Sequence, residues 1–115
     1  MNSKYILIVS GEPNSIFSEI LFKALKKEKF KNPIILISSK KIIEIQMKYL
    51  KFKKKIKVLD FRKLNEYKLD NKSINLINVN YNQRRPFEKI SKNSNKFISE
   101  SFKLAIKIMK KYKIV

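Results

Sequence analysis

The residues best placed to do chemistry lie near the start of this sequence, where an apolar run leads into Gly11, Glu12 and Pro13 and then an amphipathic stretch that carries Glu19. A β-branched run ended by Gly and Pro predicts a buried strand, a sharp turn and a helix. In such a unit the helix directs its free N–H groups into the crevice at the carboxyl end of the strand, which suits phosphate or carboxylate. Many α/β domains begin this way without a ligand, so a structural role stays open.

Each charged candidate has a structural alternative. Glu12 could orient a ligand hydroxyl or a metal-bound water, or it could form a weak surface ion pair with one of the many lysines. Glu19 falls in the first turn of the expected helix, where the dipole favours a carboxylate in any case. Arg84 and Arg85 could clamp a phosphate or simply face solvent. No residue is assigned a catalytic role.

Composition limits the chemistry that is available. The chain has 115 residues, of which 43% are hydrophobic, so we expect about one domain with a modest core. It contains no cysteine and no histidine, which excludes disulfides, thiolate metal sites and the usual acid/base group. Carboxylates, lysines, hydroxyls and the backbone remain, and no metal ligands are assigned.

The net charge of +19 raises nucleic acid or an anionic membrane as a partner. The lysines are spread along the chain, however, and only residues 51–57 are dense enough to form a patch. Arginine, which dominates direct base readout, occurs three times, so a nucleic-acid partner is not favoured. The longest apolar runs are far shorter than the roughly 20 residues that span a bilayer, and no leader pattern opens the chain. We therefore expect a cytoplasmic protein with no membrane partner.

Alternating apolar periodicities predict an α/β fold with a mainly parallel sheet. The expected strands are residues 5–9, 34–37, 55–59 and 73–79, and the expected helices are residues 15–29, 40–50 and 93–112. Residues 60–72 are predicted to be a surface excursion with at most one turn of helix, and residues 80–86 an irregular loop. Residues 112–115 resemble the start of another strand, which indicates a truncated piece of a longer α/β protein.

Caps and inward faces follow from the same periodicities. The possible caps are Asn14 or Ser15, Ser38 or Ser39, and Ser91 or Asn93. The inward positions expected on the three helices are Ile16, Ile20, Leu21, Ala24 and Leu25; Ile42, Ile43, Ile45 or Gln46, Met47 and Leu50; and Phe97, Ile98, Ser101, Phe102, Ala105, Ile106, Ile108 and Met109.

Residues 11–19 resemble the amino-terminal signature of the 4-hydroxythreonine-4-phosphate dehydrogenase family, Gly-(Asp/Glu)-Pro-x-Gly-Ile-Gly-Pro-Glu. The matching positions are Gly11, Glu12, Pro13, Ile16 and Glu19. The similarity continues through residues 23–25, the apolar run 33–37 and the long helix 94–108. It covers the whole chain but only about the first third of a typical family member. The implied fold is a three-layer α/β domain with a mainly parallel sheet of the isocitrate/isopropylmalate dehydrogenase-like type, incomplete at the carboxyl end, of which residues 1–115 form the amino-terminal part.

The resemblance implies an NAD-dependent oxidation of 4-phosphooxy-L-threonine in vitamin B6 (pyridoxine) biosynthesis, followed by loss of carbon dioxide. It also implies a homodimer whose histidines hold a divalent metal, and none of those histidines lies in this chain. A role close to substrate or cofactor can be carried over to Gly11, Glu12, Pro13 and Glu19. We therefore expect the 115-residue chain alone to be inactive.

Three departures from the signature bear on this reading. Ser15 and Phe17 replace two glycines, and Ser18 replaces the proline. Because glycine permits close backbone approach, Phe17 could fill space that the usual loop leaves for a ligand. The alternative is a small basic module, either nucleic-acid-binding or repurposed and non-catalytic.

Overall fold

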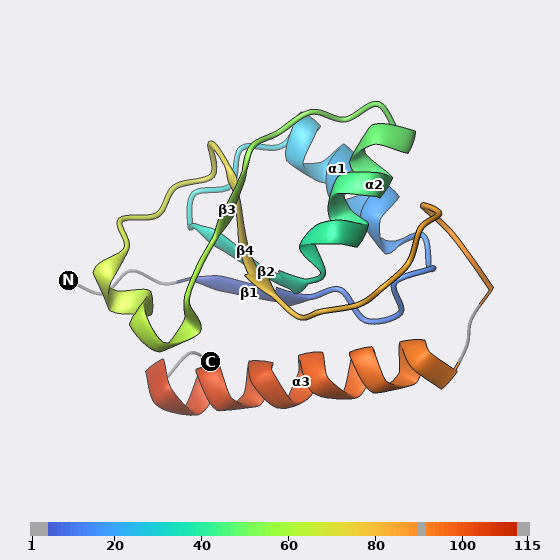
Figure 1. Ribbon diagram of the computed structural model, residues 1–115. Coiled ribbons are helices and arrows are strands. Elements are labelled where there is room, and N and C mark those ends of the chain that lie inside the picture. Colours follow the sequence, from blue (N-terminus) through green and yellow to red (C-terminus); the bar gives the residue numbers. More distant parts are fainter. Residues whose placement is uncertain (1–4, 90–91, 113–115) are drawn as a thin grey trace.

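The computed structural model describes residues 5–89 and 92–112, and within them four strands form one parallel sheet. The strands are β1 (Ile6–Val9), β2 (Ile34–Ser38), β3 (Ile56–Val58) and β4 (Ile74–Asn78). Their spatial order is β1-β2-β4-β3, and each of the three pairings is parallel (Figure 1). The four strands expected from the sequence are therefore confirmed.

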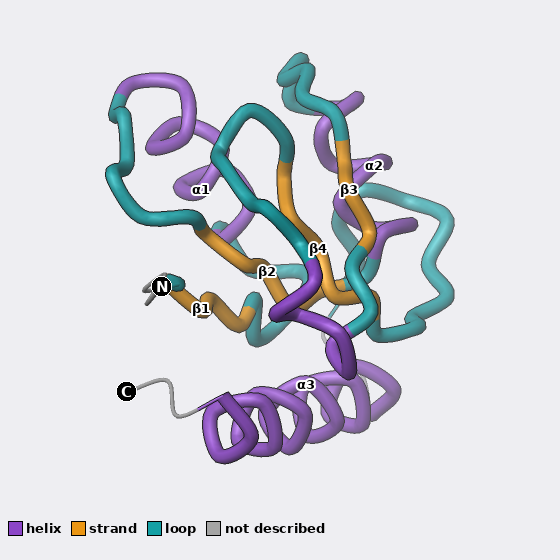
Figure 2. The backbone as a smooth tube through the Cα atoms, turned by 90° about the vertical axis from the view of Figure 1, so that its left-hand side faces the viewer, coloured by secondary structure: helices purple, strands orange, loops and turns teal. Residues whose placement is uncertain are grey.

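Helices cover both faces of the sheet. The helices α1 (Phe17–Lys27) and α2 (Lys40–Tyr49) lie on one face, and α3 (Lys92–Tyr112) lies on the other (Figures 1 and 2). A short 3-10 helix, η1 (Phe61–Glu66), packs on the same side as α3, because Leu64 belongs to the core cluster that contains Phe97. This three-layer arrangement confirms the predicted α/β class with a parallel sheet.

Burial differs between the central and edge strands. Every residue of β2 is buried, and so are the first four residues of β4, as expected for central strands covered on both faces. The expectation that β1 is a buried strand is wrong, since its residues are half-buried and Ile6 is exposed. The reason is its position, because among residues 5–89 and 92–112 a strand pairs with β1 on one side and none on the other.

The inward face of α1 is rotated relative to the expectation. Ser18, Leu21 and Phe22 are buried, whereas Ile16 and Ile20 are exposed, contrary to the predicted stripe. Phe22 stacks on Phe52 with ring centroids 4.8 Å apart, so contacts with the segment after α2 fix the rotation of the helix. The Ser39 cap of α2 is confirmed, because its side chain accepts a hydrogen bond from the Ile42 N–H.

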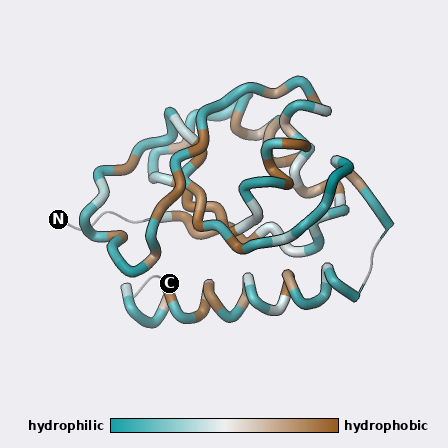
Figure 3. The backbone as a smooth tube through the Cα atoms, viewed as in Figure 1, coloured by the Kyte–Doolittle hydropathy of each residue, from teal (hydrophilic) through white to brown (hydrophobic). Residues whose placement is uncertain are grey.

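The face that α3 presents to the sheet is narrower than predicted. Phe97, Ser101, Ala105 and Ile108 are buried, whereas Phe102, Ile106 and Met109 are exposed, so the expectation for these last three residues is wrong. Ser101 and Ala105 have small side chains, and the part of α3 that packs against the sheet is the narrow stripe that contains them. Figure 3 shows apolar residues concentrated on the strands and on the helix sides that face them.

Residues 60–72 are more than a surface excursion. Leu64 is completely buried, and the Tyr112 hydroxyl donates to the Phe61 carbonyl at 2.8 Å and accepts from the Leu64 N–H at 3.1 Å. These bonds attach η1 to the last turn of α3. The expectation of at most one turn of helix is wrong, since η1 has six residues in a 3-10 helix, and the segment contributes to the core.

Two expectations at the carboxyl end of the chain fall partly on residues outside the described part. Asn93 lies inside α3, so it is not the cap, and Ser91 lies outside the described residues. The strand expected over residues 112–115 falls on Tyr112, which ends α3, and on residues outside the described part of the chain. Within residues 5–89 and 92–112, no helix has the length and apolar character needed to cross a membrane.

Asp60 gives the fold a testable pH dependence. Its carboxylate accepts from Arg62 Nε and Nη2, both at 3.1 Å, and these side-chain bonds hold the pKa of Asp60 below its ordinary value of 3.8. A lowered folded-state pKa gives stability that is present above pH 3.8 and is lost as pH falls through the folded pKa. We expect Asp60→Asn to flatten the decline of the melting temperature below about pH 4, measured by circular dichroism. Parallel declines in the two proteins would contradict this expectation.

Candidate functional site at the carboxyl edge of the sheet

The loop after β1 turns sharply at the carboxyl edge of the sheet. The Ser10 N–H donates to the Ile37 carbonyl at 3.1 Å, so β1 stays paired with β2 up to the turn. Gly11 then adopts a φ of +70°, and a Cβ built on it would meet no atom within 4 Å. Pro13, two residues further along, is buried. Glycine is therefore required for backbone conformation, and the space beside it is open.

The conformation of Gly11 predicts a modest cost of substitution. Gly11→Ala is expected to lower the free energy of unfolding by about 1–2 kcal/mol, because a left-handed conformation strains an L-residue while the open space adds no clash. Gly11→Asn is the matched control and should cost less, since asparagine tolerates this region. Urea denaturation of the three proteins measures both effects. An alanine variant as stable as the native chain would show that the turn is not left-handed.

Glu12 closes the loop onto itself. Its Oε1 accepts from the Asn14 N–H at 3.0 Å, and its carbonyl accepts from the Ser15 N–H at 3.2 Å. The Ser15 hydroxyl donates to the same carbonyl at 2.9 Å and accepts from the Phe17 N–H at 3.2 Å. The chain's own oxygens thus bind the N–H groups of Asn14, Ser15 and Phe17, of which the last belongs to the first turn of α1.

The other charged candidates lie on the surface. Glu19 forms an i,i+4 ion pair with Lys23 at 3.5 Å, and its side chain is about half exposed. Arg84 and Arg85 are both exposed. The structure gives Glu12 and Glu19 separate partners and does not join them in one cluster.

Two buried glutamines, which sequence reasoning did not identify as site residues, connect this loop to residues 80–88. Gln46 Nε2 donates to the carbonyls of Pro13 and Pro86, both at 2.8 Å. Gln83 Nε2 donates to Asn14 Oδ1 at 2.8 Å. The only sequence signal was a polar residue on the inward side of the helix at position 46. Together the glutamines connect the Gly11 loop to residues 80–88.

This junction also contains unpaired polar atoms. Among the described residues, four buried side-chain atoms have no hydrogen-bond partner, namely Ser10 Oγ, Asn14 Nδ2, Ser18 Oγ and Gln83 Oε1. Three of them belong to residues 10–18. Buried polar atoms are nearly always paired, and the exceptions gather where function or ordered water requires them. Their concentration makes the Gly11 loop a candidate site for a polar ligand.

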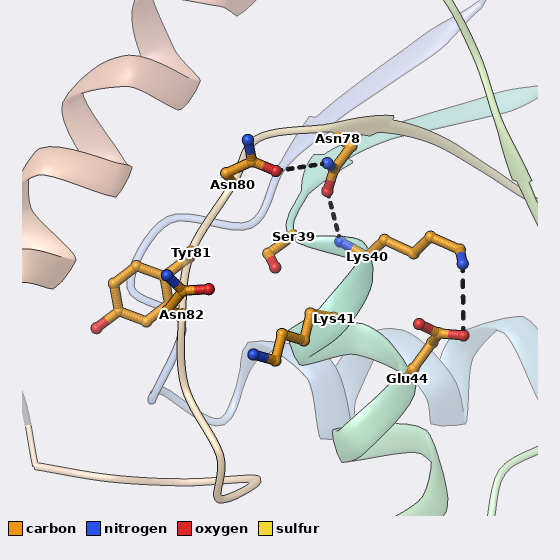
Figure 4. A pocket seen from close by; sticks show the side chains of 8 residues that line it. All are labelled: Ser39, Lys40, Lys41, Glu44, Asn78, Asn80, Tyr81 and Asn82. Carbon is orange, nitrogen blue, oxygen red and sulfur yellow. Dashed lines mark hydrogen bonds and ion pairs between the residues drawn. The ribbon is translucent and has the colours of Figure 1, made fainter.

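A cavity of about 420 Å³ lies nearby, at the carboxyl ends of β2 and β4 (Figure 4). Asn78 Oδ1 accepts from the Lys40 N–H at 2.8 Å, while Lys40 Nζ pairs with Glu44 at 3.6 Å. Lys41 extends toward Tyr81 and Asn82 (Figure 4). The lining is polar and carries two lysines, which suits a small polar or anionic ligand. The cavity residues are Ser39, Lys40, Lys41, Glu44, Asn78, Asn80, Tyr81 and Asn82.

Comparison with known proteins gives matches among solved structures. No family model and no curated protein sequence matches this chain. A 4-hydroxythreonine-4-phosphate dehydrogenase from Burkholderia phymatum superposes with a TM-score of 0.80 at 18% identity, over 99% of this chain and 35% of that one. The 4-hydroxythreonine-4-phosphate dehydrogenase from Klebsiella pneumoniae superposes with a TM-score of 0.80 at 16% identity, over 97% of this chain and 35% of that one. A protein from Salmonella typhimurium described as a putative 4-hydroxythreonine-4-phosphate dehydrogenase superposes with a TM-score of 0.78 at 16% identity, over 96% of this chain and 35% of that one.

The chain has the fold of 4-hydroxythreonine-4-phosphate dehydrogenases. It spans about a third of the length of these dehydrogenases. The resemblance seen in residues 11–19 is thus confirmed in the fold, and at this level of identity the likeness concerns the fold alone.

The departures from the dehydrogenase signature have definite places in the structure. The Ser15 hydroxyl accepts a hydrogen bond from the Phe17 N–H, but the N-cap of α1 is Ile16. The expectation that Asn14 or Ser15 caps this helix is therefore wrong. Ser18 is buried on α1. Phe17 packs against the core cluster that contains Leu21 and Phe22. Since no atom lies within 4 Å of a Cβ built on Gly11, Phe17 does not fill the space beside that residue.

The divalent metal implied by the dehydrogenase resemblance does not fit this chain. The sequence has no histidine or cysteine, and the described residues contain no group of three potential metal ligands. Ligands for such a metal would have to come from other polypeptide.

Proposed function

We propose that residues 1–115 form the amino-terminal part of a single larger α/β domain of an NAD-dependent dehydrogenase, of the kind represented by 4-hydroxythreonine-4-phosphate dehydrogenase. The observation that carries the proposal is the match over 99% of this chain at a TM-score of 0.80. The Gly11-Glu12-Pro13 turn supports it, since this turn lies at the carboxyl edge of the sheet, where open α/β sheets bind their ligands.

In this proposal the substrate is small and phosphorylated, 4-phosphooxy-L-threonine being the substrate of the family that the sequence resembles. NAD would accept a hydride from the carbon that bears the hydroxyl group. In this proposal the residues of this chain position the substrate and the cofactor. Gly11 keeps space open beside the turn, Glu12 accepts a hydrogen bond from the Asn14 N–H within the loop, and Glu19 lies in the first turn of α1.

The polar cavity provides a second wall of the proposed site. Lys41 and Asn82 are the cavity residues placed to contact an anionic or hydroxylated ligand, since Lys40 is paired with Glu44. A homodimer, a cytoplasmic location and a role in pyridoxine biosynthesis complete the proposal, and a metal would be held by residues outside this chain.

The test compares the 115-residue chain with the longer product of its reading frame. With 4-phosphooxy-L-threonine, NAD and a divalent metal, the longer product should form NADH, and the 115-residue chain should form none. NAD reduction by the short chain alone would refute its expected inactivity. A longer product that folds but leaves this substrate unoxidised would refute the proposed function.

A non-catalytic module is the second candidate, and one observation favours it. The N–H groups of Asn14, Ser15 and Phe17 are bound by Glu12 and Ser15, so these three donors need no ligand. A nucleic-acid-binding form of this module would show an affinity that falls steeply with salt, by several counterions per complex. Weak binding that is insensitive to salt would exclude it.

A further inference from the structure

The amino ends of the parallel strands lie at the edge of the sheet opposite the candidate site. Three segments meet at this edge, namely residues 26–33 before β2, residues 51–57 leading into β3, and residues 67–73 before β4. Figure 1 shows them side by side at the upper left, where these three strands begin. We call the surface formed by these three segments the basic edge.

One asparagine joins two segments of the basic edge. Asn71 Nδ2 donates to the carbonyls of Phe30 and Asn32, at 3.2 and 2.9 Å. Its Oδ1 accepts from the Ile34 N–H at 2.9 Å. A single side chain from residues 67–73 thus binds the backbone at three points in and next to residues 26–33.

The third segment is attached to the same loop. The Ile74 N–H, directly after residues 67–73, donates to the Lys55 carbonyl at 2.7 Å. Lys57 Nζ lies 5.5 Å from the centre of the Tyr67 ring, close enough for a cation–π contact. The basic edge is therefore one connected surface, although its segments are far apart in the sequence.

This surface carries positive charge that no neighbouring carboxylate neutralises. Its segments contain eleven lysines and two acidic residues, Glu28 and Asp70. Among the described residues of the chain, the ion pairs lie elsewhere, and no lysine of the basic edge forms one. Ten of the eleven lysines are exposed and Lys54 is half-buried. The eleven are Lys26, Lys27, Lys29, Lys31, Lys51, Lys53, Lys54, Lys55, Lys57, Lys68 and Lys72.

The fold changes what the lysine distribution implies. Along the sequence only residues 51–57 are dense enough to form a patch, but the fold brings two further lysine-bearing segments beside them. Lysines on an edge strand such as β3 also discourage pairing with other chains. Residues 26–33 and 67–73 belong to no strand, so protection of an edge does not account for their lysines.

We propose that the basic edge binds the phosphate backbone of nucleic acid without reading its sequence. Lysine pairs with phosphate as a point charge, and each phosphate that it neutralises releases counterions. Direct base readout relies mainly on arginine, and the three segments contain none. The surface lies at the opposite edge of the sheet from the Gly11 loop, so this binding does not depend on the dehydrogenase activity proposed above.

The scarcity of exposed apolar side chains favours nucleic acid over an anionic membrane. Proteins that lie on a membrane surface insert apolar side chains beside their basic residues. Phe30 is the one exposed large apolar residue of the basic edge, and it is 37% exposed. A nucleic-acid duplex requires no such insertion, because it presents one negative charge per roughly 1.7 Å of its axis.

Fluorescence anisotropy with a short labelled DNA duplex tests the proposal in the 115-residue chain. We expect the affinity to fall by about a hundredfold or more between about 50 and 200 mM KCl, because several counterions are released on binding. An A·T-rich and a G·C-rich duplex should bind within about threefold of each other, since phosphate contacts carry no sequence information. A preference of more than about tenfold for either duplex would contradict recognition through the backbone.

A triple substitution locates the binding surface. Lys31→Gln, Lys53→Gln and Lys68→Gln together remove one exposed lysine from each segment of the basic edge. We expect this variant to bind the duplex about tenfold or more weakly, and the slope of log affinity against log salt to become shallower by about three.

The matched control removes the same charge from another surface. Lys92→Gln, Lys96→Gln and Lys103→Gln lie at exposed positions of α3, and together they should weaken binding by less than about threefold. Circular dichroism of both variants shows whether they keep the native helix content.

Three results would overturn the proposal. The first is an affinity that does not change with salt. The second is an equal loss of affinity in the two triple variants, which would assign binding to the overall charge of the chain. The third is tighter binding to vesicles that contain about 30% phosphatidylserine than to the duplex, which would assign the basic edge to a membrane surface.

Discussion

Replacement of Phe97 by alanine is expected to lower the free energy of unfolding by about 3–5 kcal/mol, a large part of the stability of a domain this size. Phe97 is 2% exposed and lies in the core cluster with Leu64 and Ile108. Its ring centroid is 5.2 Å from that of Tyr81, on the loop after β4. The substitution removes the contacts that hold α3 against both η1 and this loop. Urea denaturation followed by circular dichroism measures the loss.

The same helix offers a matched control. Phe102 is 49% exposed, so Phe102→Ala in the 115-residue chain should change the free energy of unfolding by less than about 1 kcal/mol. The comparison separates burial from helix propensity, because both substitutions replace phenylalanine by alanine within α3. Equal losses would mean that α3 presents its other flank to the sheet.

The central strands and the cap of α2 could be predicted from the sequence. The apolar run at residues 34–37 is continuous, as is typical of a strand buried on both faces, whereas alternation predicts the strand at residues 73–79; both occupy central positions. Ser39 could be identified as a cap because it precedes the apolar period of α2. These signals depend on residues that are adjacent in sequence, so they do not depend on how the rest of the chain folds.

Helix rotation could not be predicted, because it depends on partners distant in sequence. The apolar residues of α3 span a wide arc, and the periodicity does not state which part of it faces the sheet. In the structure, contacts between α3 and Phe61, Arg62 and Leu64 fix that choice. For α1 the stacking of Phe22 on Phe52 does the same and leaves Ile16 and Ile20 exposed.

The candidate site was predicted in part. The position of Gly11 at the end of β1 could be inferred from the sequence, but the bonds by which Glu12 and Ser15 bind the following N–H groups could not. The polar cavity requires the carboxyl ends of β2 and β4 to be neighbours, although β3 lies between them in sequence. Periodicity does not reveal strand order, so this cavity could not be found without the fold.

Gln46 carries the second large expected effect. Its Nε2 donates to the buried Pro13 carbonyl and to the Pro86 carbonyl, so Gln46→Met keeps the volume and removes both donors. Because an unsatisfied buried acceptor costs about 1–3 kcal/mol, we expect the free energy of unfolding to fall by about 2–4 kcal/mol. Lys48→Met, at an exposed position of the same helix, is the control and should stay within about 0.5 kcal/mol of the native chain.

A second measurement shows whether Gln46 acts on the loops. The Glu88 N–H donates to Asn14 Oδ1 at 2.7 Å, across the junction that Gln46 holds. If the glutamine fixes the two loops, Gln46→Met should speed hydrogen exchange at Glu88 by more than it speeds exchange at Leu36 in the buried strand β2. A uniform increase at both amides would instead mean that Gln46 stabilises the whole fold and that the loops at the carboxyl edge are held by Gln83 and Asn14 alone.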